Sequence, residues 1–324
     1  MKKKIIILIL FIILLVSLYL ALFAGYNDIG INLFQKAFNL ENDTDSMILT
    51  LLRYPRTIKA LIAGICLALA GMFMQAITKN PLAEPYLTGV SAGAGLGIVL
   101  SILFFNTINY SIFGFLGALI ASFLVIIFSG FSKFSITKLI LIGLSINVFS
   151  SAIMSLIILV NPMKSYTMML ILSGGVTNNE IISSKVLALI FILLMLICVF
   201  FVPKLNFLRL DGALLEVNKN KKYFYSAIMI IISAMLTSIS VFCAGILGFV
   251  GIIAPQISKM LLGQDYRYLF VSNILLGASF ILLADFISRT IIYPLQVPLG
   301  LIVAFIGAPI FVYFLTKKGD MFND

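Results

Sequence analysis

The chain contains no histidine, few cysteines and little charge. Without histidine it can form no histidine-based metal site, no haem ligation through imidazole and no Ser–His–Asp catalytic site. The three cysteines, Cys66, Cys198 and Cys243, lie in separate apolar runs without a C-x-x-C spacing, which argues against a bound metal or a disulfide framework. Only 10% of residues are charged, whereas a soluble domain has about 25%, so a soluble fold is excluded.

Long apolar runs take up most of the chain. Apolar residues are 62% of the 324 residues, and the mean hydropathy is +1.17. One membrane helix needs about 20 apolar residues, and the sequence contains ten runs that can serve. We therefore predict an all-α polytopic membrane protein, with residues 1–324 as a single transmembrane domain. The predicted spans are 5–22, 57–78, 90–106, 111–131, 138–160, 185–203, 223–243, 248–262, 269–291 and 298–316.

The run 248–262 differs from the other nine. It is short for a span and contains Pro255, which predicts a partial helix buried against its neighbours.

The net charge of +10 is unevenly distributed along these spans. With the lysines of the first run in the cytoplasm, ten crossings place both termini there. Fifteen of the 22 lysines and arginines then face the cytoplasm, as the positive-inside rule requires. Arg53, Arg56 and Arg289 are exceptions, because they fall on the outer side. No basic cluster sits on a soluble module, so binding to nucleic acid is not predicted.

Four segments combine arginine, proline and glycine in distinctive patterns. The first is Arg53-Tyr-Pro-Arg56, followed by Gly71 and Gln75. The second segment is Asn80-Pro81-Leu-Ala-Glu-Pro85, which leads to Gly89 and Gly93. The third is Gly248-Phe-Val-Gly251, followed by Pro255-Gln256. The fourth combines Asp285 and Arg289 with Pro298-Leu-Gly300 and Pro309.

The glycine-rich run 89–97 has two interpretations. A phosphate-binding loop would need a preceding strand and a following Gly-Lys-Ser/Thr, and neither is present. Small residues also let membrane helices approach closely, and this interpretation is favoured. No Walker A motif occurs in the chain, so any ATP hydrolysis must take place in another subunit.

Taken together and in this order, the four segments resemble the FecCD family of ABC-transporter permeases, which import iron–siderophore complexes, haem and vitamin B12. The resemblance spans about residues 45–316. It implies a type II ABC importer permease in the bacterial cell membrane, paired as a homodimer or with a paralogous permease. It also implies cytoplasmic ATPase subunits that bind ATP and Mg, and an extracytoplasmic substrate-binding protein. This chain itself is expected to bind lipid but no cofactor or metal, and to have no catalytic residue.

Two departures from the family pattern concern individual contacts. Where the family has Pro-His, this chain has Pro255-Gln256. The glycines and alanine of the family's coupling segment do not align with residues 210–219, although its place between the sixth and seventh spans is kept.

The resemblance implies a docking role for the outer arginines. In the family, arginines of this motif meet glutamates on the two lobes of the binding protein, and guanidinium suits bidentate contact with carboxylates. We therefore predict that Arg53, Arg56 and Arg289 dock the binding protein. The alternative is that Arg53 and Arg56 extend to the lipid interface. Asp285, four residues before Arg289, is predicted to pair with it and orient it.

The residues 205–222 are predicted to be a cytoplasmic coupling segment. The segment is short and amphipathic, and a solvated loop is the alternative. We predict short helices that insert into a cleft on the ATPase subunit through Leu208, Leu210, Asp211, Leu214 and Leu215.

A transport pathway is harder to derive from sequence. A large iron chelate needs a wide and weakly binding tunnel, for which the small, polar or flexible candidates are Ser91, Ser145, Asn147, Met168, Met169 and Ser173. Helix packing explains these residues equally well. The outer segment 161–185, which contains Gly174-Gly175, is predicted to form an outer gate helix.

The predicted function is the permease subunit of an ABC importer for an iron complex, with a ferric siderophore favoured and haem or cobalamin as alternatives. A different class, a secondary transporter driven by an ion gradient, needs intramembrane carboxylates. Asp285 is the one candidate, and it has an arginine beside it. A membrane enzyme is not supported, since no catalytic constellation is present.

Overall fold

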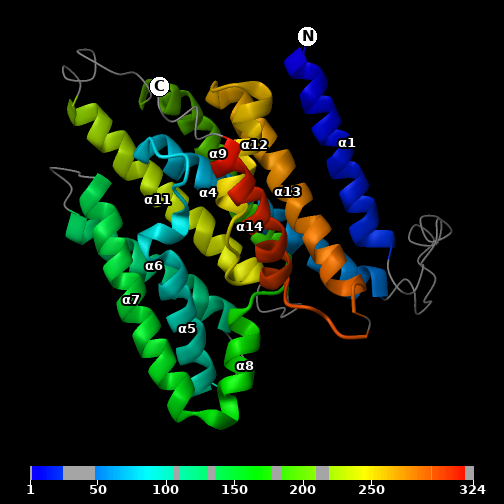
Figure 1. The fold of residues 1–324 in the computed structure, drawn as a ribbon, viewed down its shortest axis with the longest axis vertical. Helices are drawn as coiled ribbons and strands as arrows, with labels where there is room; N and C mark the ends of the chain where they lie inside the picture. The colour runs from blue at the N-terminus through cyan, green and yellow to red at the C-terminus, as the bar shows by residue number, and fades with distance from the viewer. Residues whose placement is uncertain are drawn as a thin grey trace.

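The described residues of the computed structural model are 2–24, 48–105, 110–129, 136–176, 184–208, 219–292 and 294–317, and all their regular structure is helical (Figure 1). Eleven α-helices are present in these ranges. They are α1 (Lys2–Phe23), α4 (Tyr54–Thr78), α5 (Val90–Phe105), α6 (Tyr110–Ser129), α7 (Ile136–Val160), α8 (Pro162–Leu172), α9 (Ser184–Leu208), α11 (Lys219–Ala244), α12 (Val250–Leu262), α13 (Tyr266–Thr290) and α14 (Leu299–Lys317). A π-helical turn, η1 (Ile48–Arg53), precedes α4, and a 3-10 turn, η2 (Pro85–Thr88), precedes α5.

Each of the ten apolar runs forms a helix. Seven of these helices are long and apolar enough to cross a membrane, while α5, α12 and α14 are shorter apolar helices. The chain is therefore a multi-pass membrane protein, as predicted. The eleventh helix, α8, lies within the segment that was expected to form an outer gate helix. Helix α1 begins and α14 ends at the same end of the bundle (Figure 1).

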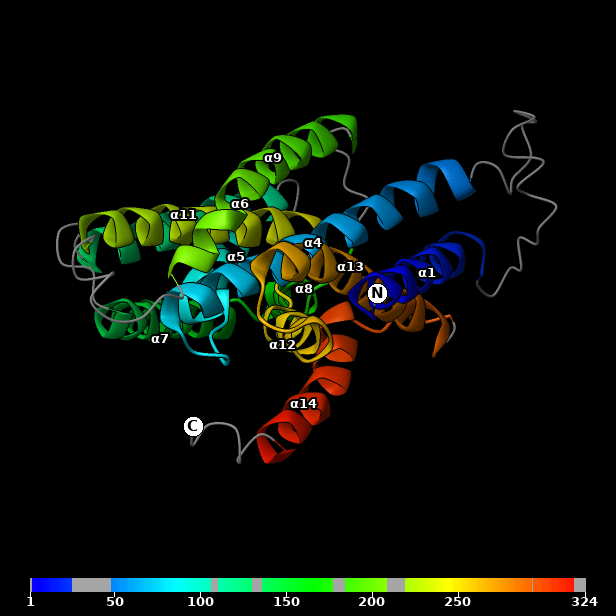
Figure 2. The ribbon, with the colours of Figure 1, turned by 90° about the horizontal axis from the view of Figure 1, so that it is seen from above.

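Helix α4 forms the centre of the bundle. Nearly every side chain from Pro55 to Ile77 is buried, whereas α7 is largely exposed. Seen from above, α4 lies between α9 on one side and α14 on the other (Figure 2). Close approach at Gly71 explains part of this packing, because a Cβ there would overlap the backbone of Gly251 in α12. Small residues thus let the helices pack in contact without any hydrophobic driving force from lipid.

Two interruptions in the helices shorten α5 and α12. Helix α11 ends at Ala244, and α12 begins only at Val250, so the backbone of 245–249 is non-helical. The linker 79–89 likewise delays the start of α5 until Val90. Irregular backbone in a membrane protein is tolerated where protein groups satisfy its polar atoms. Consistent with this, the hydroxyl of Tyr86 accepts a 2.9 Å hydrogen bond from the Leu247 N–H.

The prediction for 248–262 is confirmed. Helix α12 has 13 residues, and its first seven, from Val250 to Gln256, are all buried. It is therefore a partial helix enclosed by its neighbours.

Candidate functional site

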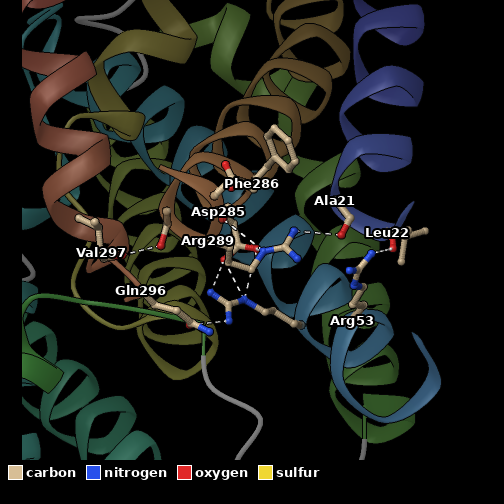
Figure 3. A network of polar contacts seen from close by, with 11 residues as sticks. Ala21, Leu22, Arg53, Asp285, Phe286, Arg289, Gln296 and Val297 are labelled. Atoms are coloured by element: carbon tan, nitrogen blue, oxygen red, sulfur yellow. Dashed lines mark hydrogen bonds and ion pairs between the residues drawn. The ribbon is translucent and has the colours of Figure 1, made fainter. Parts of the chain in front are cut away.

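One end of the bundle, which we call the arginine end, brings together three parts of the chain that are far apart in the sequence (Figure 3). They are the end of α1, the start of α4, and the end of α13 with the segment that follows it. Arg53 closes η1, and Arg56 lies in the first turn of α4. Asp285 and Arg289 are in the last two turns of α13, and Gln296 is in the segment that leads to α14. Pro55 at the start of α4 suits this geometry, since proline fits the first turn of a helix and has no N–H to satisfy.

Asp285 is the centre of the cluster. Its carboxylate is 2.9 Å from Nη2 of Arg56 and 3.1 Å from Nε of Arg289, and its side chain is only 2% exposed. The pairing of Asp285 with Arg289, predicted from their spacing, is therefore present. The pairing with Arg56 was not predicted, because the two residues are 229 positions apart and no local signal connects them.

Arg53 and Arg289 also hold the end of α1. Nη1 of Arg53 donates to the Leu22 carbonyl at 2.9 Å, and Nη2 of Arg289 donates to the Ala21 carbonyl at 3.0 Å. The last carbonyls of a helix have no partner within the helix and carry partial negative charge, so cations there are stabilising. The arginine end thus joins α1, α4 and α13, and among the described residues it brings three arginines close to the Asp285 carboxylate or to the end of α1.

Arg56 turns into the protein, not towards a lipid interface. Its Nη1 donates to Oε1 of Gln296 at 3.0 Å, while Nε and Nη2 contact Asp285. Both Arg56 and Gln296 line a cavity of about 170 Å³. The other walls of the cavity come from α5, α6, α8, α11, the last turn of α13 and the segments 174–176 and 297–299.

A second polar cluster ties the linker 79–84 to α12. Nε2 of Gln256 donates to the Pro81 carbonyl at 2.6 Å, and Nζ of Lys259 donates to Oε1 of Gln75 at 2.7 Å. Gln75 in turn donates to the Gly251 carbonyl at 3.3 Å. Gln75 and Gln256 are buried. The glutamine that stands where the family has histidine therefore anchors the linker through a donated hydrogen bond.

The asparagine, proline and glycine residues of the linker and of the other motif segments have structural roles. Oδ1 of Asn80 accepts from the Leu82 N–H at 2.9 Å, which forms a turn. Pro85 contacts Gly251, and Gly89 has a φ of 79° that favours glycine. Two further glycines lie at contacts between segments: Gly93 lies against Gly117, and the Gly300 N–H donates to the Ser173 carbonyl. Pro255 lies inside α12 and Pro309 inside α14. Gly248 and Pro298 lie in the irregular segments before α12 and α14.

The six pathway candidates do not form one surface. Met168 is fully buried with Ile98, Val99 and Ile102, because α8 packs against α5, and its assignment to a pathway stays a prediction. Asn147 donates to the Tyr86 carbonyl at 3.0 Å and so supports η2. Ser145 and Met169 are exposed, whereas Ser91 and Ser173 are half-buried.

Ser145 does line a feature of the surface. Together with Phe128, Ile142, Ile146 and Phe149 it surrounds an open groove of about 520 Å³ between α6 and α7.

The coupling residues lie largely outside the described ranges. Leu210, Asp211, Leu214 and Leu215 fall between α9 and α11, where no structure is described. Leu208 is in the last turn of α9 and is 2% exposed within the main core. It packs inside this chain, and its role in coupling stays a prediction.

Asp265, at the start of α13, supports the end of α9. Its carboxylate accepts hydrogen bonds from the Arg267 N–H at 3.0 Å and from Asn206 at 3.1 Å. The Arg267 hydrogen bond is the main reason that the pKa of Asp265 lies below its usual value. Through Asn206 this cap ties the start of α13 to the last turn of α9.

Comparison with known proteins gives consistent matches over nearly the whole chain. The profile of the FecCD transport family matches residues 13–317. The "Fe(3+)-citrate import system permease protein YfmD" of Bacillus subtilis is 33% identical over 95% of this chain and 93% of the relative. The "Probable heme-iron transport system permease protein IsdF" of Staphylococcus aureus is 30% identical over 98% and 97%. A solved metal-chelate type ABC transporter in an inward-facing conformation superposes with a TM-score of 0.84 at 27% identity, covering 97% of this chain and 99% of the other.

Proposed function

The chain belongs to the FecCD transport family, and from this premise we propose that it is the membrane-spanning permease subunit of an ABC importer that carries a ferric siderophore into the cytoplasm. The permease works as a pair, with cytoplasmic ATPase subunits and an extracytoplasmic substrate-binding protein. Relatives whose names specify iron citrate and haem iron support an iron chelate as the cargo.

The observation that carries the docking part of the proposal is the charge of the arginine end. Arg56 and Arg289 share the carboxylate of Asp285, so among the described residues this pair keeps an excess of one positive charge, and Arg53 lies at the same end of the bundle. Arginine binds carboxylates in bidentate geometry, and such contacts are stronger than neutral hydrogen bonds. An acidic surface on each lobe of a binding protein is the partner that this excess charge fits.

Asp285 argues against a transporter driven by an ion gradient. A carboxylate that carries an ion across the membrane must exchange its partner with solvent. Asp285 is nearly inaccessible and is paired with two arginines, which suits a residue that orients them.

A charge reversal tests the docking role. Arg56 and Arg289 both support Asp285, so Arg53 is the least disruptive position for the change. We expect Arg53→Glu in the permease to weaken association with the binding protein. Because the contact is electrostatic, the difference in affinity between the parent and Arg53→Glu should shrink as salt is raised. Arg267→Glu is the matched control, since Arg267 is an exposed arginine at the opposite end of α13. Equal affinity of the parent and Arg53→Glu for the binding protein would refute docking at Arg53.

Transport itself requires the assembled complex. The permease reconstituted with its ATPase and binding protein is expected to take up labelled ferric siderophore when ATP is supplied, and to do so without an ion gradient. Labelled haem and cobalamin are the competing cargoes in the same vesicles. Uptake that follows an imposed ion gradient in the absence of ATP would overturn the proposal.

A further inference from the structure

Gln296 joins the proposed docking arginine to the wall of the cavity at the arginine end. We propose that Gln296 is a positioning residue through which contact of a binding protein with Arg56 is transmitted to the segment 296–300 and to the cavity that it lines. The inference rests on the docking role proposed above. It assigns a function to a contact between a side chain of α4 and a segment outside the helices.

The two sides of the Arg56 guanidinium have different partners. Nε and Nη2 contact Asp285, at 3.0 and 2.9 Å, so one edge is fixed to α13. Nη1 contacts Gln296 at 3.0 Å. In the described part of the chain these bonds use three of the five N–H groups of arginine. An acidic group of a docked partner can therefore bind Arg56 without displacing Asp285 or Gln296.

The segment that contains Gln296 is bonded to two other parts of the cavity wall. The Val297 N–H donates to the Ser288 carbonyl at 3.1 Å, which fixes the segment to α13. The Leu299 N–H donates to the Gly174 carbonyl at 3.1 Å, which fixes it to the segment that follows α8. All four of these residues line the cavity. Movement of Gln296 is thus passed to a continuous hydrogen-bonded wall.

The bonded wall continues to the interruption between α11 and α12. The Gly175 N–H donates to the Ala244 carbonyl at 2.9 Å, at the last residue of α11. A few residues further on, the Leu247 N–H is bound by Tyr86 of η2. Irregular backbone held by such specific bonds can adopt a second arrangement more readily than a continuous helix. The physical connection therefore runs from Arg56 to the interruption near the middle of the bundle.

The contrast between the two partners of Arg56 explains why Gln296 carries this role. Asp285 connects two long, packed helices, α4 and α13, and its removal would disturb the whole cluster. Gln296 is exposed, and its contact with Arg56 is a single hydrogen bond from the guanidinium to an uncharged amide oxygen. Loss of this hydrogen bond leaves the ion pairs of Asp285 intact. A variant of Gln296 should therefore still dock the binding protein, while the cavity wall no longer responds to docking.

The experiment uses the complete transporter in lipid vesicles, with binding protein titrated against ATP hydrolysis. Two quantities are read: the binding-protein concentration for half-maximal stimulation, and the maximal stimulation. For Gln296→Ala we expect the first to stay within about twofold of the parent. The second should fall by about 2- to 30-fold, the range for residues that couple two sites. Gln296→Glu should restore stimulation, because a carboxylate accepts from Nη1 more strongly than an amide.

Leu295→Ala is the control, since Leu295 is the exposed neighbour in the same segment. The inference is overturned if Gln296→Ala keeps the parental maximal stimulation. It is also overturned if Gln296→Ala changes only the half-maximal concentration, or if Gln296→Glu is as defective as Gln296→Ala. Arg56→Glu separates this inference from the docking proposal. Unchanged docking in Arg56→Glu refutes docking at Arg56, whereas weakened docking with a normal Gln296→Ala refutes only the role of Gln296.

Discussion

Replacing Asp285 with asparagine should destabilise the permease strongly, because it leaves two arginines facing each other. The side chain keeps its size but loses the charge that lies 2.9 Å from Arg56 and 3.1 Å from Arg289. At such distances each pair gains roughly 5 kcal/mol of Coulomb attraction for an effective dielectric constant of about 20. Desolvation of the carboxylate, which is 2% exposed, offsets much of this gain.

Removal of one partner of a buried ion pair typically lowers the free energy of unfolding by about 3–5 kcal/mol, and we take this range for Asp285→Asn. Both arginine side chains remain 15% exposed, so water relieves part of the repulsion and the lower value applies. A loss of about 3 kcal/mol corresponds to a fall of roughly 4–5 °C in the melting temperature for a chain of 324 residues, at an unfolding entropy of about 2.1 cal/mol/K per residue. Because α1 is held by Arg53 and Arg289, it should be the first helix to become sensitive to protease.

Thermal unfolding of the purified protein in detergent measures this change, and a second substitution tests its cause. Arg56→Gln in the Asp285→Asn background removes the facing charge and should recover at least about 1 kcal/mol of the loss, since contacting residues are not additive. The reasoning is refuted if Asp285→Asn melts at the parental temperature, or if the double variant loses the sum of the two single losses.

Three further outcomes follow from other contacts. Gly71→Ala should lower the free energy of unfolding by about 1–3 kcal/mol or more, because the new Cβ overlaps Gly251. The control is Gly248→Ala, which should melt at the parental temperature because Gly248 has open space around it. Gln256→Leu should lower the free energy of unfolding by about 1–3 kcal/mol, because it leaves the partly buried Pro81 carbonyl of the linker without this donor, and equal melting would contradict that role. Asp265→Ala should lower the free energy of unfolding by about 1 kcal/mol, because α13 loses its N-terminal cap. Since the pKa of Asp265 is lowered, its contribution should persist at neutral pH and be lost only as pH falls below about 4, which a pH series of melting curves measures.

The sequence by itself determined which parts of the chain are helices. Ten apolar runs became ten helices because each membrane helix satisfies its own backbone hydrogen bonds and needs only a sufficient local run of apolar residues. The same local logic found the pairing of Asp285 with Arg289, since residues four apart share a helix face. Pro255 and the short run around it likewise indicated the partial helix α12.

Only the tertiary structure decided which helices meet. The sequence gives no sign that Arg56 reaches Asp285 and Gln296, or that Arg289 holds the end of α1, because these contacts join segments more than 200 residues apart. The burial of Met168 is likewise a result of tertiary packing: its flexible side chain suited a pathway, and the packing of α8 on α5 encloses it in this structure. In lipid, most helix faces are apolar, so hydrophobicity does not specify partners. The fit of small residues such as Gly71 and Gly251, and the few polar groups that must be paired, select them.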